Sequence, residues 1–147
     1  MGIHHLNIRW ILSCTMKRIT IYEGQRDRNK CDNLEAALRE NGDLVLESYF
    51  LGDPDQTFWA GGDREFWIIV KAEHVPKVRK LLINERFETA AAFEGWVQEL
   101  TAKTGNLEGT QDPIILLWLI KEWFADEHLF SQWLKKKKIP FDIQHVG

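Results

Sequence analysis

The sequence predicts an α+β domain with a small, mainly antiparallel sheet of three to four strands packed by about five helices. Residues 44–50 and 64–70 alternate in the direction of their side chains with the period of two that strands have. The segment between them, GDPDQTFWAGG, contains one proline and three glycines, which end strands. From residue 73 onward, apolar residues recur with helical spacing. These observations indicate a long-looped hairpin followed by a helical layer.

Size and composition are those of one ordinary domain. The chain has 147 residues, of which 44% are hydrophobic and 28% charged, enough to bury a core. Most of the seven tryptophans occupy positions that periodicity would bury, so we interpret them as core residues. A net charge of −3 argues against nucleic acid as the partner, because phosphate-binding domains are usually basic. Two cysteines are too few for a disulfide framework, and we predict a cytoplasmic protein without a membrane partner.

We interpret the first fifteen residues as a leader or an extension. Residues 11–14 faintly resemble a lipoprotein cleavage box, but the apolar run before them is too short and is interrupted by Arg9. The sequence MKRITIYEG, from Met16, is a more natural start. We therefore predict a single domain over residues 16–147.

The first elements of this domain are predicted as a strand and a helix. In the strand, residues 18–22, Ile19 and Ile21 face the core, while Thr20 and Tyr22 face away. A helix then begins with Asp32 as N-cap and buries three apolar residues. Glu35, three residues after Asp32, completes a capping box, and Gly42 ends the helix with a positive φ. The three predicted core residues of this helix are Leu34, Ala37 and Leu38.

The two strands of the hairpin divide their residues between two faces of the sheet. The nearly continuous apolar run in residues 64–70 predicts a central strand that is covered on both faces. One face carries Leu44, Leu46, Ser48, Phe50, Arg64, Phe66, Ile68 and Val70, and the other carries Val45, Glu47, Tyr49, Glu65, Trp67 and Ile69.

Four helices and a last strand follow. Helices are predicted from near residue 73, over residues 88–103, over residues 113–127 and over residues 127–138, and a short strand around Phe141 to Gln144 returns to the sheet. The third helix starts at Pro113 and is apolar nearly all round, yet it is far shorter than the roughly 20 residues that span a bilayer. We expect it to be the central buried helix, with Trp118 largely buried; a surplus apolar side would instead serve a homodimer. The lysines at 135–138 suit the C-terminal end of a helix dipole.

No metal or cofactor site is predicted. The five histidines lack the spacing that places two imidazoles on one helical face. Asp53 and Asp55 resemble the first ligands of a calcium loop, but Arg64 occupies the position where that loop needs a carboxylate. No phosphate-binding or dinucleotide-binding glycine motif is present.

Cys31 is the one candidate nucleophile. It directly precedes the predicted helix and follows three basic residues, and both features stabilise a thiolate. No histidine lies near it in the sequence. An enzyme or redox protein that uses Cys31 is therefore an alternative rather than the leading hypothesis.

A candidate binding surface combines aromatic and acidic residues. If helices cover one face of the sheet, the other face carries Tyr22, Glu47, Tyr49, Glu65 and Trp67. Glu47 and Glu65 could serve acid–base chemistry, but two solvated carboxylates are far commoner. The long loop adds Phe58 and Trp59, because apolar loop tips usually pack back or meet a partner. Such a mixture is typical of protein-binding patches.

From Met16 onward the chain resembles small uncharacterised bacterial proteins of the toxin-immunity type. The residues that carry this resemblance are Asn41 to Glu47 (NGDLVLE), Leu51-Gly52, Glu65-Phe66-Trp67, Trp133-Leu134 and Ile139 to Asp142 (IPFD). The resemblance implies a mixed α/β fold and a toxin as the protein partner, and it transfers no catalytic residue. The sequence therefore predicts a non-catalytic protein-binding module, with an enzyme that uses Cys31 and a structural homodimer as the alternatives.

Overall fold

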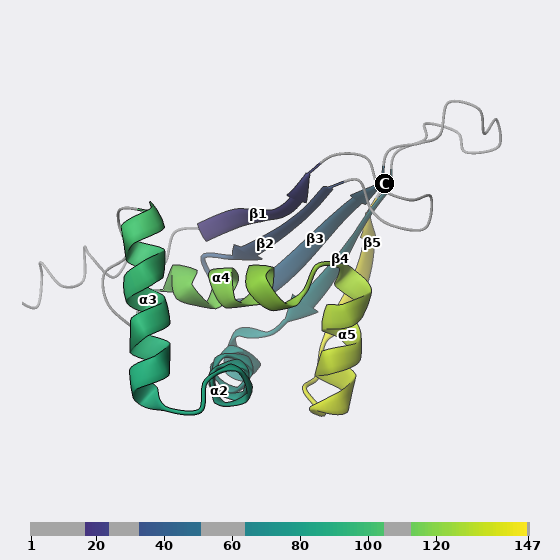
Figure 1. Ribbon diagram of the computed structural model, residues 1–147. Coiled ribbons are helices and arrows are strands. Elements are labelled where there is room, and N and C mark those ends of the chain that lie inside the picture. The colour runs from purple at the N-terminus through teal and green to yellow at the C-terminus, as the bar shows by residue number, and fades with distance from the viewer. Residues whose placement is uncertain (1–16, 24–32, 51–63, 105–112, 147) are drawn as a thin grey trace, which may run out of the picture.

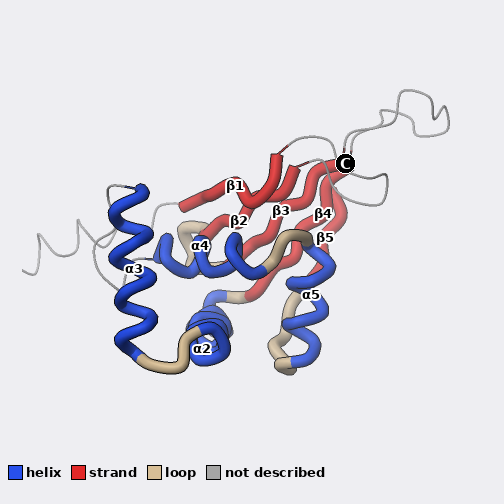
Figure 2. The backbone as a smooth tube through the Cα atoms, viewed as in Figure 1, coloured by secondary structure: helices blue, strands red, loops and turns tan. Residues whose placement is uncertain are grey.

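The protein is an α+β domain in which helices cover one face of a five-stranded antiparallel sheet. A computed structural model describes residues 17–23, 33–50, 64–104 and 113–146. The strands lie in the order β1-β2-β3-β4-β5, so each strand pairs with its neighbour in the sequence. Figures 1 and 2 show the helices grouped on one side of the sheet. The elements are β1 (Lys17–Glu23), β2 (Asn33–Leu38), β3 (Leu44–Phe50), β4 (Arg64–Val70), the 3₁₀-helix η1 (Ala72–His74), α2 (Val75–Arg86), α3 (Ala90–Thr104), α4 (Pro113–Trp123), α5 (Glu127–Lys136) and β5 (Asp142–Val146).

The predicted hairpin is confirmed. β3 pairs antiparallel with β4 in a regular register that places Leu46 opposite Ile68 and Glu47 opposite Trp67. The predicted terminal strand is also confirmed, since β5 pairs with the other side of β4. β4 therefore lies inside the sheet, in agreement with its nearly continuous apolar run.

The helix predicted around residues 33–41 is wrong, because residues 33–38 form strand β2 between β1 and β3. Leu34, Ala36 and Leu38 alternate toward the helices and are buried, while Ala37 is fully buried on the opposite face. Pairing on both sides outweighs the helical preference of the NLEAAL sequence, because tertiary contacts override a weak local propensity. The described residues accordingly form five strands and four α-helices, where three to four strands and about five helices were predicted.

Gly42 has the predicted positive φ, but in a hairpin turn rather than at a helix end. Its φ is +92°, and its N–H donates to the Arg39 carbonyl across the β2–β3 turn. The Asp43 N–H donates to the Asn41 side chain at 3.0 Å, and the Asp43 carboxylate accepts from the Ala72 N–H at 2.8 Å. A Cβ at Gly42 would lie 3.0 Å from the Ala72 Cβ. Glycine is needed here both for its conformation and for this close approach.

The core lies between the sheet and the helices. α4 packs across β1 and β2, and α5 begins with Asp126 as N-cap, whose carboxylate accepts from the Leu129 N–H at 2.9 Å. Trp118, expected to be largely buried, is half-buried and lies outside the core cluster. The helical residues in the core cluster include Val78, Leu82, Phe93, Val97, Ile115, Leu116, Leu117, Leu119, Ile120, Phe130 and Leu134.

None of the helices in the described part of the chain combines the length and the apolar character that crossing a bilayer demands.

Candidate functional site

The candidate site is the face of the sheet opposite the helices, called the outer face below. The strand register assigns three rows of residues to it across the five strands. Figure 1 shows no helix on this side in the described ranges. The residues of the outer face are Arg18, Thr20, Asn33, Glu35, Ala37, Val45, Glu47, Tyr49, Glu65, Trp67, Ile69, Asp142 and Gln144.

The middle row of the outer face holds a bridged pair of carboxylates. Glu35 of β2 lies directly opposite Glu47 of β3, an arrangement in which like charges repel. Arg18 of β1 offsets this repulsion by binding both carboxylates. Its Nη1 donates to Glu35 Oε2 at 2.5 Å and also to Glu47 Oε2, and its Nη2 donates to Glu47 Oε1 at 3.3 Å. The arginine thereby ties three neighbouring strands together.

The same bridge favours the charged form of Arg18. The hydrogen bond to Glu47 is the largest influence and raises the pKa of Arg18, against the opposing effect of burial. Both carboxylates are occupied by a permanent cation, which makes them poor candidates for a general acid or base. Sequence reasoning considered Glu47 with Glu65, but these are diagonal neighbours, since Glu65 lies opposite Tyr49. The true partner, Glu35, was missed because its segment was predicted as helix.

Trp67 is the aromatic centre of the outer face. It is half-buried, and the guanidinium carbon of Arg39 lies 4.8 Å from its ring centroid, within the range of a cation–π interaction. Arg39 follows β2 and Trp67 belongs to β4, so this contact spans β3 beside the fully buried Val45. Tryptophan and arginine are the residue types most enriched at binding hot spots.

Tyr22 does not belong to this face. A β-bulge between Thr20 and Tyr22 shifts the register of β1, so that Tyr22 lies opposite Leu34 and packs against the core on the helix side. The extra residue of a bulge reverses the alternation that follows it. The sequence contains no signal that would have revealed this bulge. Glu47, Tyr49, Glu65 and Trp67 do lie together as predicted.

Three other predicted residues, Cys31, Phe58 and Trp59, lie outside the described residues. The structure therefore gives no geometry for the nucleophile hypothesis or for the loop part of the binding surface. Within residues 17–23, 33–50, 64–104 and 113–146, no three histidine, cysteine or carboxylate side chains gather closely enough to hold a metal ion.

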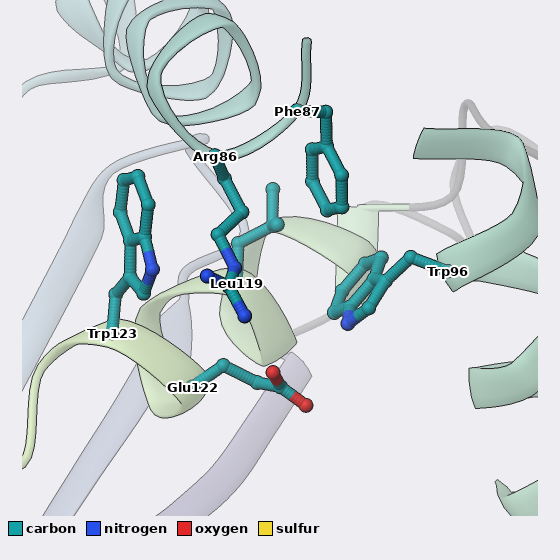
Figure 3. A pocket seen from close by; sticks show the side chains of 6 residues that line it. All are labelled: Arg86, Phe87, Trp96, Leu119, Glu122 and Trp123. Carbon is teal, nitrogen blue, oxygen red and sulfur yellow. The ribbon is translucent and has the colours of Figure 1, made fainter. Parts of the chain in front are cut away.

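A shallow hollow between α2, α3 and α4 was not predicted (Figure 3). Arg86 points across it, with its guanidinium carbon 5.8 Å from the Trp123 ring centroid. Its empty volume is about 160 Å³ and is open to solvent, whereas small-molecule pockets usually measure 300–1,000 Å³. The hollow is thus too small for a typical substrate. Its lining residues are Arg86, Phe87, Trp96, Leu119, Glu122 and Trp123.

Comparison of this chain with known protein families, curated proteins and solved structures found no match.

Proposed function

We propose that the protein is a non-catalytic protein-binding module that uses its outer face, and that its partner is a bacterial toxin which it inhibits. The observation that carries this proposal is the Trp67–Arg39 pair beside Tyr49 and Glu65, on a sheet face without a helix in the described ranges. A tryptophan on a rigid strand loses little conformational entropy on binding, and tryptophan, tyrosine and arginine are the residues enriched at the hot spots that provide most of the affinity. The resemblance to immunity-type proteins supports the choice of a toxin.

The charges of the outer face support the same proposal. Among the outer-face residues named above, four are acids, Glu35, Glu47, Glu65 and Asp142, and one is a base, Arg18, to which Arg39 adds a second. Four negative and two positive charges leave these six residues at −2 at neutral pH. Such a surface attracts a basic partner and accelerates its association.

The two alternatives have less support. For the enzyme alternative, no histidine lies near Cys31 in the sequence to serve as its base. In α4, the five residues Ile115, Leu116, Leu117, Leu119 and Ile120 are buried within the monomer, so that little apolar surface is left for a homodimer through this helix.

The test uses two matched tryptophans. Trp67 and Trp118 are both half-buried, and both have a cation over the ring, Arg39 at 4.8 Å and Lys121 at 5.0 Å. Trp67 lies on the outer face and Trp118 on α4. The protein encoded by the neighbouring gene is purified and titrated by calorimetry with wild type, Trp67→Ala and Trp118→Ala.

We expect Trp67→Ala to weaken binding at least tenfold, which corresponds to about 1.4 kcal/mol, because it removes a hot-spot side chain. Trp118→Ala should change the Kd less than twofold. Far-ultraviolet circular dichroism checks that both variants are folded. Equal effects of the two substitutions would place the interface elsewhere, and no binding to the neighbouring gene product would remove the toxin-inhibitor form of the proposal.

A further inference from the structure

The two edges of the sheet differ in how they are protected. On β1, the bulge between Thr20 and Tyr22 interrupts regular pairing, and Lys17 and Arg18 supply positive charge at the start of the strand. Bulges and charged side chains are the usual means by which proteins prevent another strand from pairing with an edge. The β1 edge is thus closed to a further strand.

The β5 edge has no bulge, and its charged residue, Asp142, is acidic. Its five residues, DIQHV, pair with β4 without a register shift. They contain no proline and no lysine, and residues 142–145 are all exposed. β5 is the last strand in the order of the sheet, and no backbone partner is found for its outer side in the described ranges. A row of N–H and C=O groups therefore faces away from β4, which is the requirement for strand addition.

The side chains along this edge differ between the two faces. Ile143 lies opposite the buried Ile68 on the helix side, yet it is 50% exposed. On the outer face, Asp142 and Gln144 flank the edge, and Glu65 lies on β4 opposite Val146. An incoming strand would thus meet an apolar side chain on one face and carboxylates on the other.

We propose that β5 binds an extended segment of a protein partner, which adds to the sheet as a sixth strand with apolar and basic residues in alternation. Because strand side chains alternate between faces, the apolar positions would cover Ile143, and the lysines or arginines would approach Asp142 and Glu65. This inference rests on the proposed function, since it requires a protein partner, and it specifies the chemistry of the segment that the partner provides.

A second copy of the chain fits this edge less well. Antiparallel pairing of two β5 strands about Gln144 would place Asp142 opposite Val146 of the other copy. Val146 lies beside Glu65 on β4, so two acids would approach each other on the outer face at both ends of the pair. Like charges near one another across strands are destabilising, whereas a basic segment would neutralise them.

The test uses a labelled eight-residue peptide of alternating lysine and valine and a matched peptide with glutamate in place of lysine. Binding is followed by fluorescence anisotropy, and the amides of residues 142–146 by NMR hydrogen exchange. Ile143→Lys is compared with Leu129→Lys, because Leu129, 46% exposed on α5, is the other large apolar residue exposed in the described structure. The two variants carry the same added charge.

We expect the lysine peptide to protect the β5 amides and to bind at least tenfold more tightly than the glutamate peptide. Ile143→Lys should weaken binding of the lysine peptide at least tenfold, and Leu129→Lys should weaken it less than twofold. Asp142→Asn should weaken it about threefold and should make binding less dependent on salt. The inference would be overturned if the β5 amides stayed unprotected or if the two peptides bound equally well. It would also be overturned if Ile143→Lys and Leu129→Lys had equal effects, or if the protein formed dimers through β5.

The failure of this inference is distinguishable from failure of the proposed function. If a purified partner depends on Trp67 but is insensitive to Ile143→Lys, the strand addition is wrong and the outer-face interface stands. If partner binding is insensitive to Trp67→Ala while the peptide protects the β5 amides, the proposed outer-face interface is wrong and the strand addition at β5 is retained.

Discussion

The two faces of the sheet are closed in different ways. On the helix side, Leu46 of β3 is fully buried beneath the helical layer. On the outer face its neighbour Val45 is equally buried, although no helix in the described ranges lies there. Long side chains extend over this face: Arg39, which follows β2, reaches Trp67, and Arg18 of β1 reaches two carboxylates. Such side chains bury their stems while presenting polar ends outward, so a face closed in this way can still recognise a partner.

The largest expected effect is a difference in stability loss between a cavity made beneath the helices and one made beneath the side chains of the outer face. Leu46→Ala should lower the free energy of unfolding by about 3 kcal/mol, because packed helices cannot collapse into the cavity. Val45→Ala should cost only about 1–2 kcal/mol, because flexible side chains can move into the space. Denaturant unfolding of both variants measures the difference. An equal or larger loss for Val45→Ala would show that the outer face is packed as rigidly as the core.

A smaller effect is expected from the bridge on the outer face. Arg18→Met should lower the free energy of unfolding by about 1–2 kcal/mol, since it leaves Glu35 and Glu47 opposite each other without a cation. High salt should reduce this loss, and Glu35→Gln in the same chain should recover part of it. Lys17→Met, on the same strand, is the control for simple loss of charge. If Arg18→Met matches this control at all salt concentrations, the bridge contributes nothing.

The smallest effect concerns the polar link within the helical layer. Glu85 of α2 accepts a hydrogen bond from Trp133 Nε1 at 2.9 Å and pairs with Lys137 at the end of α5. Burial alone would raise the pKa of Glu85, but the bonds from Lys137 and Trp133 outweigh it and lower the pKa below 4.5. A lowered pKa in the folded state stabilises the protein above the unfolded pKa, and this contribution is lost as the pH falls through the folded value.

Glu85→Gln should therefore destabilise the protein at pH 7 by less than about 1 kcal/mol, and the difference from wild type should disappear well below pH 4.5. Thermal unfolding between pH 7 and pH 3 follows this, with the exposed Glu99→Gln on α3 as the control. A difference that persists at low pH would mean that the carboxylate charge is not what holds α2 and α5 together.

The sequence by itself determined the elements whose pattern is strong over their whole length. Alternation over residues 44–50 and 64–70 predicted both the pairing of β3 with β4 and the face of each residue, including Glu47 and Trp67. The helical stripe of Phe93, Val97 and Leu100 predicted α3, and these three residues are buried. In these segments the local pattern and the tertiary environment favour the same structure, so the pattern alone is sufficient.

Only the tertiary structure decided the features that depend on pairing between distant segments. Residues 33–38 contain good helix formers and a capping pattern, yet they become a strand because β1 and β3 satisfy their backbone from both sides. The β1 bulge moves Tyr22 to the core side. The bridge of Arg18 to Glu35 and Glu47 joins residues that are 17 and 29 positions apart. Register between strands is set by the whole sheet and not by local propensity, so the composition of the candidate site follows from the order of the strands.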